Sequence, residues 1–252
     1  MSRVMVTVAG RTVEVDYTLD PPPFYDLATD RLSNWTLDVG VPNNALGYDV
    51  KANVRLVGGR LFLRGARELA PDGKTPYTSA DALARHVRLP MFYTAEVVSR
   101  CAFGSGIWPC PFWTRALDGG PGEIDLMEQM GLEPRFKATL HGPYKPLPEP
   151  MVGKTKLWSS LPNLDPADWH TWRLVKSPGL FEHYVDGIKF ASITRAAAVA
   201  AGIDFDGIYE NAARPQYPRV TLQIGSTKAA GLPDDSFTEA TLEIASLRIW
   251  TP

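Results

Sequence analysis

Three carboxylic acids stand close together in residues 122–131, which read Gly-Glu-Ile-Asp-Leu-Met-Glu-Gln-Met-Gly. Glu123, Asp125 and Glu128 lie within six positions and have apolar neighbours. Cleavage of a glycosidic bond needs two carboxyl groups, one acting as an acid and one as a nucleophile or base. The types and spacing of these residues therefore indicate that reaction. The alternative is three solvated acids on an exposed strand or helix.

The local conformation decides whether the three acids can act together. In a helix, Glu123 and Glu128 would point about 140° apart around the axis. In a strand, Glu123 and Asp125 share one face, but strict alternation would bury Glu128 on the other, which is costly for an unpaired carboxylate. One extra residue at Leu126 and Met127, a β-bulge, returns Glu128 to the acidic face. The sequence therefore predicts a bulged strand.

Three carboxyl groups this close cannot all ionise freely, so we expect the pKa of at least one to rise. That carboxyl would stay protonated as the acid while another is anionic. A separation of about 5–5.5 Å between the two working carboxyls would imply retention, and about 6.5–9.5 Å would imply inversion.

Composition limits the class of protein. The 252 residues are 44% hydrophobic, which is enough for a sizeable core, and 22 prolines with 21 glycines favour an all-β chain of short elements. A net charge of −2 gives no electrostatic reason to expect nucleic acid or a membrane as partner. Residues 1–15 lack a secretory-signal core, and no run approaches the length of a membrane span.

The cysteines and histidines give no sign of a metal or cofactor. Cys101 and Cys110 form no C-x-x-C pair and have no metal-ligand spacing with the four histidines. The two cysteines could form one disulfide or remain buried thiols. We expect no cofactor and no metal.

Apolar alternation and turn residues predict short strands about ten residues apart. Hairpins are expected around Ala9-Gly10 and Gly58-Gly59, and further strands at residues 94–101, 112–115, 170–175, 181–185, 188–190, 220–224 and 241–250. Only residues 193–201, with five alanines, read as a short helix. This pattern indicates a sandwich or jelly roll. We expect one domain over residues 1–252, with residues 1–20 as an N-terminal extension.

The order of motifs along the chain resembles the family-16 glycoside hydrolases, which include laminarinases, lichenases, agarases and carrageenases. The family carries G-[LI]-W-P-A-F-W, G-E-I-D-x-x-E, T-x-H, W-H-x-[YF] and Y-x-D-G, and counterparts in this chain occupy residues 106–113, 122–128, 139–141, 169–172 and 184–187. The match runs from about residue 35 to the C-terminus, and its central block is the specific part. The resemblance implies an all-β fold, a concanavalin A-like β-jelly-roll sandwich with a concave substrate cleft.

The resemblance also implies roles for the acids. Glu123 resembles the nucleophile, Glu128 the general acid/base, and Asp125 the helper that holds the nucleophile. The bulged spacing is similar to that of the laminarinase and agarase branches, so double displacement with retention is the implied mechanism.

Four further residues resemble the family's substrate-binding positions. Trp108 and Trp113 match tryptophans that line the cleft, where an aromatic face packs on a sugar ring; a core position is the alternative for each. His141 matches a cleft histidine, and Gln223 stands where many members carry a cleft Asn. Trp158 is either a further sugar platform or part of the core or rim.

The chain departs from the family pattern in three places. Residues 77–81 read Tyr-Thr-Ser-Ala-Asp where members often carry Y-T-S-G-R-I, so the Arg contact at that position is absent. Ala245 stands where many members have an Asp that helps bind a structural calcium, so we expect no calcium there. Cys110 and Pro111 replace a single Ala, which should lengthen or distort that strand.

The expected function is that of a retaining endo-glycosidase, a hydrolase of O-glycosyl bonds. It would cleave internal β-glycosidic bonds of a polysaccharide, of β-1,3-glucan or galactan type, as a monomer outside the cell or at its surface. A non-catalytic carbohydrate-binding module on the same fold, or a transglycosylase, is the alternative.

Overall fold

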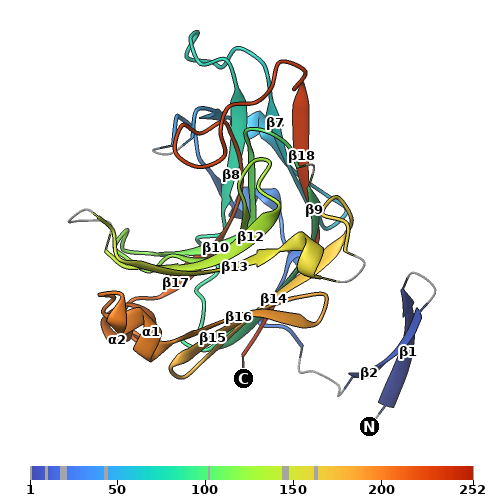
Figure 1. Cartoon of the computed structure of the whole chain (residues 1–252), viewed down its shortest axis with the longest axis vertical. Helices are drawn as coiled ribbons and strands as arrows, with labels where there is room; N and C mark the ends of the chain where they lie inside the picture. Colours follow the sequence, from blue (N-terminus) through green and yellow to red (C-terminus); the bar gives the residue numbers. More distant parts are fainter. Residues whose placement is uncertain are drawn as a thin grey trace.

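The computed structural model describes residues 2–8, 11–17, 22–42, 45–101, 103–143, 148–161 and 164–251. About half of the described residues lie in β-strands, nearly all of them antiparallel, which form two stacked layers (Figure 1). None of the described helices is long and apolar enough to cross a bilayer.

The first layer, the cleft sheet, carries the three acids. Its strands, in spatial order, are β13 (Met151–Leu157), β12 (Arg135–His141), β11 (Ile124–Gln129), β10 (Ile107–Ala116), β17 (Gln216–Ile224) and β8 (Thr78–Leu83). Two short strands pair with β8: β4 (Thr36–Leu37), antiparallel, and β5 (Tyr48–Asp49), parallel.

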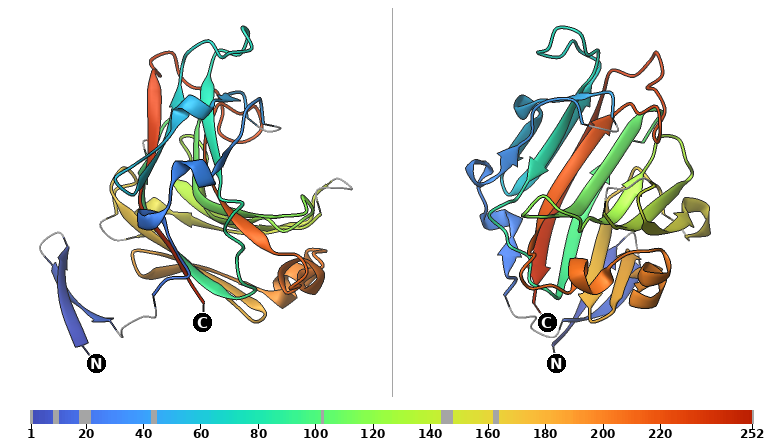
Figure 2. Two further views of the ribbon diagram at one scale, coloured as in Figure 1. Left: turned by 180° about the vertical axis from the view of Figure 1, so that it is seen from behind. Right: turned by 90° about the vertical axis from the view of Figure 1, so that its left-hand side faces the viewer.

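The second layer, the outer sheet, begins where β7 pairs with β8. Its strands, in order, are β7 (Arg60–Ala66), β18 (Glu239–Trp250), β9 (Tyr93–Cys101), β14 (His170–Ser177), β15 (Leu180–Val185) and β16 (Ile188–Thr194). At its edge β6 (Val54–Val57) pairs with β7, and β3 (Tyr25–Asp26) pairs with β18. Figure 2 shows the same layers from two other sides.

The core lies between the two sheets because each strand turns its apolar residues inward. Along β9 and β14, buried positions alternate with more exposed ones for most of the length. Phe136 of the cleft sheet packs edge-on against Trp172 of the outer sheet, with ring centroids 5.2 Å apart. The opposite face of the cleft sheet is therefore free to carry polar groups. This arrangement is the predicted all-β jelly-roll sandwich.

Most strand predictions are confirmed, including both hairpins. The N-terminal one pairs β1 (Ser2–Val8) with β2 (Arg11–Tyr17), and among the described strands these two pair only with each other. The assignment of residues 1–20 as an extension of a single domain stays a prediction. Residues 9 and 10, at its turn, lie outside the described residues.

Three of the six main strands of the cleft sheet were not predicted, nor were the short strands β4 and β5. β8 is buried at all six positions, so it shows no alternation that a sequence pattern could reveal. The other two, β12 and β13, flank the proline-rich stretch 142–150. That stretch was predicted as a loop, and its described residues contain no strand, while residues 144–147 lie outside the description.

The expectation of a single helix is wrong. The predicted helix forms as α1 (Arg195–Ala200), shorter at both ends, and a second helix follows as α2 (Phe205–Tyr209). The side chain of Asp204 caps α2 by accepting a hydrogen bond from the Gly207 amide at 3.1 Å. A five-residue helix is too short for a periodic pattern, so its cap was the only local signal.

Cys101 and Cys110 are buried thiols that are not joined in a disulfide, which resolves the choice left open by the sequence. Burial raises the pKa of both thiols. Neither cysteine is therefore a reactive thiolate.

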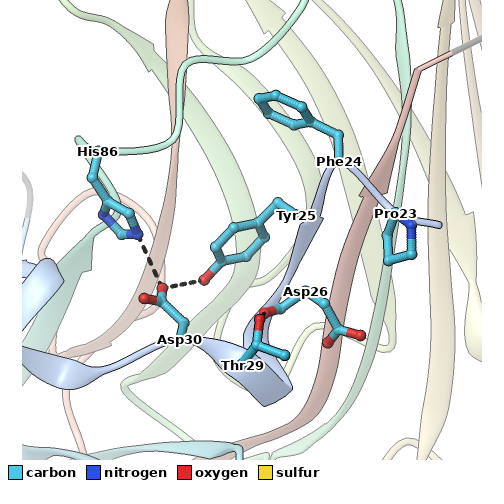
Figure 3. A pocket seen from close by; sticks show the side chains of 7 residues that line it. All are labelled: Pro23, Phe24, Tyr25, Asp26, Thr29, Asp30 and His86. Carbon is cyan, nitrogen blue, oxygen red and sulfur yellow. Dashed lines mark hydrogen bonds and ion pairs between the residues drawn. The ribbon is translucent and has the colours of Figure 1, made fainter.

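A surface hollow of about 420 Å³ lies beside the segment before β4 (Figure 3). The carboxylate of Asp30 accepts hydrogen bonds from Tyr25 Oη at 2.6 Å and Trp35 Nε1 at 2.8 Å, and lies 3.0 Å from His86 Nε2. These contacts tie residues 25–35 to the loop after β8. The polar groups of Tyr25, Asp30 and His86 in this hollow therefore serve as partners for one another.

Candidate active site

The predicted β-bulge in β11 is present. Asp125 pairs with Thr139 and Glu128 with Lys137, so three steps on β11 match two on β12. The extra residue falls at Leu126–Met127, and both of these side chains are buried. Glu128 thus returns to the face that carries Asp125, and Gln129 turns inward opposite Phe136.

A second bulge lies in the neighbouring strand β10. Cys110 pairs with Thr221 and Trp113 with Arg219, so β10 gains one residue relative to β17. This is the lengthening that Cys110 and Pro111 led us to expect. After the bulge, Trp113 lies directly opposite Asp125.

Glu128 is buried and has a defined partner. Only 9% of the residue is exposed, and Trp108 Nε1 donates a hydrogen bond to its Oε1 at 3.0 Å. Burial, and then the charge of Asp125, raise the pKa of Glu128 to about 8, although Lys137 opposes the rise. The expected rise of one carboxyl pKa is therefore found at Glu128, which stays protonated at neutral pH.

His141 stands between three carboxylates. Its Nε2 lies 2.9 Å from Asp125 Oδ2 and 3.6 Å from Glu123 Oε1, while its Nδ1 lies 2.7 Å from Glu149 Oε1. Burial alone would lower the pKa of His141, but the charge and hydrogen bond of Asp125, with the charges of Glu123 and Glu149, raise it to about 10. The ring is therefore an imidazolium that donates from both nitrogens and balances the charge of the acids.

Glu123, Asp125 and His141 offer atoms within 4.8 Å of one another, close enough to hold a metal ion. A histidine binds a metal as the neutral imidazole. Both nitrogens of His141 already have hydrogen-bond partners in this structure, Asp125 at Nε2 and Glu149 at Nδ1. We assign no metal to this cluster.

Gln223 lies opposite Trp108 in the ladder between β10 and β17. Its side chain is largely buried, and its Nε2 donates to Asp49 Oδ1 at 3.3 Å. Burial raises the pKa of Asp49 to about 8, with a further contribution from the charge of Asp81. Gln223 therefore lies beside Trp108 in the sheet. Its side chain is held by Asp49, an acid that the sequence did not single out.

Trp113 is partly covered by an arginine. The guanidinium of Arg219 lies 4.0 Å from the centre of the Trp113 ring. It is held there by an ion pair with Asp81 and another with Asp38 at 3.3 Å. Position 81 carries an aspartate and no arginine, as the sequence indicated. The arginine that contacts Trp113 is Arg219, which comes from β17.

The remaining motifs are structural. Trp158 is a core residue: it is 5% exposed, packs on Phe136 at 4.6 Å and donates to Gln129 Oε1 at 2.8 Å. The W-H-x-[YF] and Y-x-D-G motifs meet where His170 Nδ1 lies 2.8 Å from Asp186 Oδ2. This contact joins the start of β14 to the turn after β15 in the outer sheet.

The structure thus brings Glu123, Asp125, Glu128, His141 and Trp108 together, with Trp113 and Gln223 in the adjoining rows. Sequence reasoning missed Glu149, Arg219 and Asp49. Glu149 lies in the proline-rich loop, while Asp81 and Arg219 are 138 positions apart. None of these contacts has a local sequence signal.

No family model and no curated protein matches this sequence. Solved structures do match. A laminarinase catalytic domain from Thermotoga maritima has a TM-score of 0.77 at 22% identity, over 92% of this chain and 99% of that one.

An endo-β-1,3-glucanase from Pyrococcus furiosus has a TM-score of 0.72 at 23% identity, over 97% of each chain. SCLam, a non-specific endo-β-1,3(4)-glucanase from family GH16, has 0.69 at 22%, over 98% of this chain and 94% of that one. The chain therefore has the jelly-roll fold of the family-16 glycoside hydrolases.

The arrangement around His141 predicts the effect of replacing Glu149. Glu149→Gln removes one of the negative charges that stabilise the imidazolium, so the pKa of His141 should fall from its value of about 10. A ¹H–¹⁵N titration of the imidazole measures it. Glu133→Gln is the control, because Glu133 pairs with Arg135 instead. An unchanged pKa in Glu149→Gln would contradict this account of the site.

Proposed function

We propose that the protein is a retaining endo-glycosidase that cleaves internal β-linkages of a polysaccharide. The observation that carries the proposal is the row of acids that begins just before β11 and continues along it. In this row a protonated Glu128 stands one bulge away from Asp125 and Glu123. Two carboxyl groups in opposite protonation states are what glycoside hydrolysis requires.

In the first step, Glu123 attacks the anomeric carbon while Glu128 gives its proton to the departing glycosidic oxygen. The bond to the leaving sugar breaks, and a glycosyl ester forms on Glu123. In the second step, Glu128, now anionic, takes a proton from water. The water oxygen bonds to the anomeric carbon and Glu123 departs as a carboxylate, which restores the enzyme.

The neighbouring side chains serve these two steps. Asp125 holds the His141 ring by a hydrogen bond, and the imidazolium offsets the negative charge of Glu123. Trp108 orients Glu128 through its indole N–H. The exposed part of the Trp108 ring offers a surface on which a sugar ring can pack.

The substrate class follows from the structural neighbours. Several are endo-β-1,3-glucanases or laminarinases, so we propose a β-1,3-glucan as the first substrate to test. SCLam, which acts on β-1,3(4)-glucan, makes a mixed-linkage glucan the second. Loops around the cleft decide the sugar, and fold alone does not, so galactans belong in the same panel.

Glu123→Gln and Glu128→Gln should each lower hydrolysis by about a thousandfold or more, because each removes a group that exchanges a bond or a proton. Reducing-end release from β-1,3-glucan, mixed-linkage glucan, agarose and carrageenan measures it. Glu182→Gln, at an exposed ion pair with Lys189, is the matched control. Turnover at the wild-type rate in either cleft variant would refute the mechanism, and wild-type binding without hydrolysis would favour a binding module.

The pH dependence follows from Glu128. The first step needs this carboxyl protonated, and its raised pKa of about 8 keeps it so at neutral pH. The specificity constant kcat/KM should therefore fall about tenfold per pH unit above pH 8. In Lys137→Met this decline should move to higher pH, because the charge of Lys137 lowers the pKa of Glu128. A decline that begins near pH 5 in the wild type, or moves downward in the variant, would contradict the assignment.

A further inference from the structure

Glu123 lies at an open end of the β11–β12 ladder. The last regular pair of this ladder joins Ile124 to Leu140. Beyond it, only the His141 amide continues the pairing, by donating to the Glu123 carbonyl at 3.1 Å. Gly122 lies just before this end of β11, and Gly142 follows the last residue of β12. The ends of strand ladders open most readily, so the proposed nucleophile stands where its backbone needs support.

Tyr209 of α2 closes this open end. Its hydroxyl lies 2.7 Å from the Glu123 carbonyl and 2.6 Å from the His141 carbonyl. A phenol has one proton, so the two carbonyls share it as acceptors. One side chain from a distant segment thus bridges the two strands at the residues that carry the carboxylate and the imidazolium.

The Tyr209 ring is itself firmly held. It is buried and packs against Phe181 of β15 and Phe205 of α2, with centroids 5.3 and 5.7 Å away. The next residue, Glu210, accepts a hydrogen bond from Gly179 N in the β14–β15 turn at 2.5 Å and pairs with Arg195 of α1. Both helices lie where the ends of the two layers meet (Figure 1).

We propose that Tyr209 is a positioning residue for Glu123, resting on the nucleophilic role proposed above. Packing against the outer sheet fixes the position of the Tyr209 ring. The Tyr209 hydroxyl in turn fixes the distance between the backbone carbonyls of Glu123 and His141. A small displacement of a nucleophile costs much of its advantage in the transition state. Sugar contacts made by Trp108 would be unaffected, so the loss should fall on kcat and leave KM nearly unchanged.

Tyr209→Phe removes the hydroxyl and keeps the ring. The His141 amide should exchange with solvent about fivefold faster, as the loss of one hydrogen bond implies. The value of kcat should fall about tenfold with KM within about twofold. Hydrogen exchange followed by NMR and steady-state hydrolysis of the best substrate in the panel measure the two effects.

Tyr93→Phe is the matched control. Tyr93 is also buried, and Lys176 Nζ lies 5.7 Å from its ring and 6.0 Å from that of Tyr209. Within the part of the chain that the structure describes, the Tyr93 hydroxyl has no hydrogen-bond partner. This variant should leave both measurements at the wild-type values. Equal losses in the two variants would overturn the proposal, because they would reflect packing alone.

The two proposals fail separately. If the wild-type protein hydrolyses no polysaccharide, the proposed function is wrong, yet the exchange of the His141 amide still tests the role of Tyr209. Faster exchange in Tyr209→Phe alone supports the positioning role. Wild-type exchange in that variant overturns it, whatever the activity.

Discussion

One extra residue in β11 is the constraint on which the site depends. Side chains alternate along a strand, so a regular β11 would direct Glu128 to the face of Ile124, between the two sheets. An unpaired carboxylate there would lose its hydration without gaining a partner, at a cost of several kcal/mol. The bulge moves Glu128 to the opposite face and lets Gln129 turn inward, where its amide meets Trp158. A single extra residue thus keeps Glu128 out of the core and gives the buried Gln129 a hydrogen-bond partner.

The bulge also creates the electrostatic conflict that makes the site chemically useful. Glu128 is buried near Asp125, so it keeps its proton and can act as an acid. Glu123 Oε1 and Asp125 Oδ2 instead lie 3.6 and 2.9 Å from Nε2 of the His141 imidazolium. The acid with the raised pKa therefore lies beside carboxyls that contact a positive charge. Such a difference in surroundings is how one site can divide acid and base roles. The charge of His141 is favoured chiefly by Asp125, then by Glu123 and by Glu149, which contacts the ring from the loop before β13.

Much of this could be predicted from the sequence because the relevant signals are local. Burial logic applied to ten residues predicted the bulge in β11, and Cys110 with Pro111 indicated the distortion of β10. Contacts between distant segments could not be predicted. Arg219 reaches Asp81 across neighbouring strands, and Tyr209 reaches Glu123 from a helix that is five residues long. Such pairings depend on how the sheets stack, and no short pattern records that.

The central claim is that Glu123 forms a covalent bond to the sugar, and the configuration of the first product tests it most directly. A ¹H NMR spectrum recorded within the first minutes of hydrolysis, before the sugar equilibrates, distinguishes the two anomers. Double displacement inverts the anomeric carbon twice, so a β-linked substrate should release the β-anomer first. Initial release of the α-anomer would mean that water attacks directly, and it would contradict the role of Glu123 as the nucleophile.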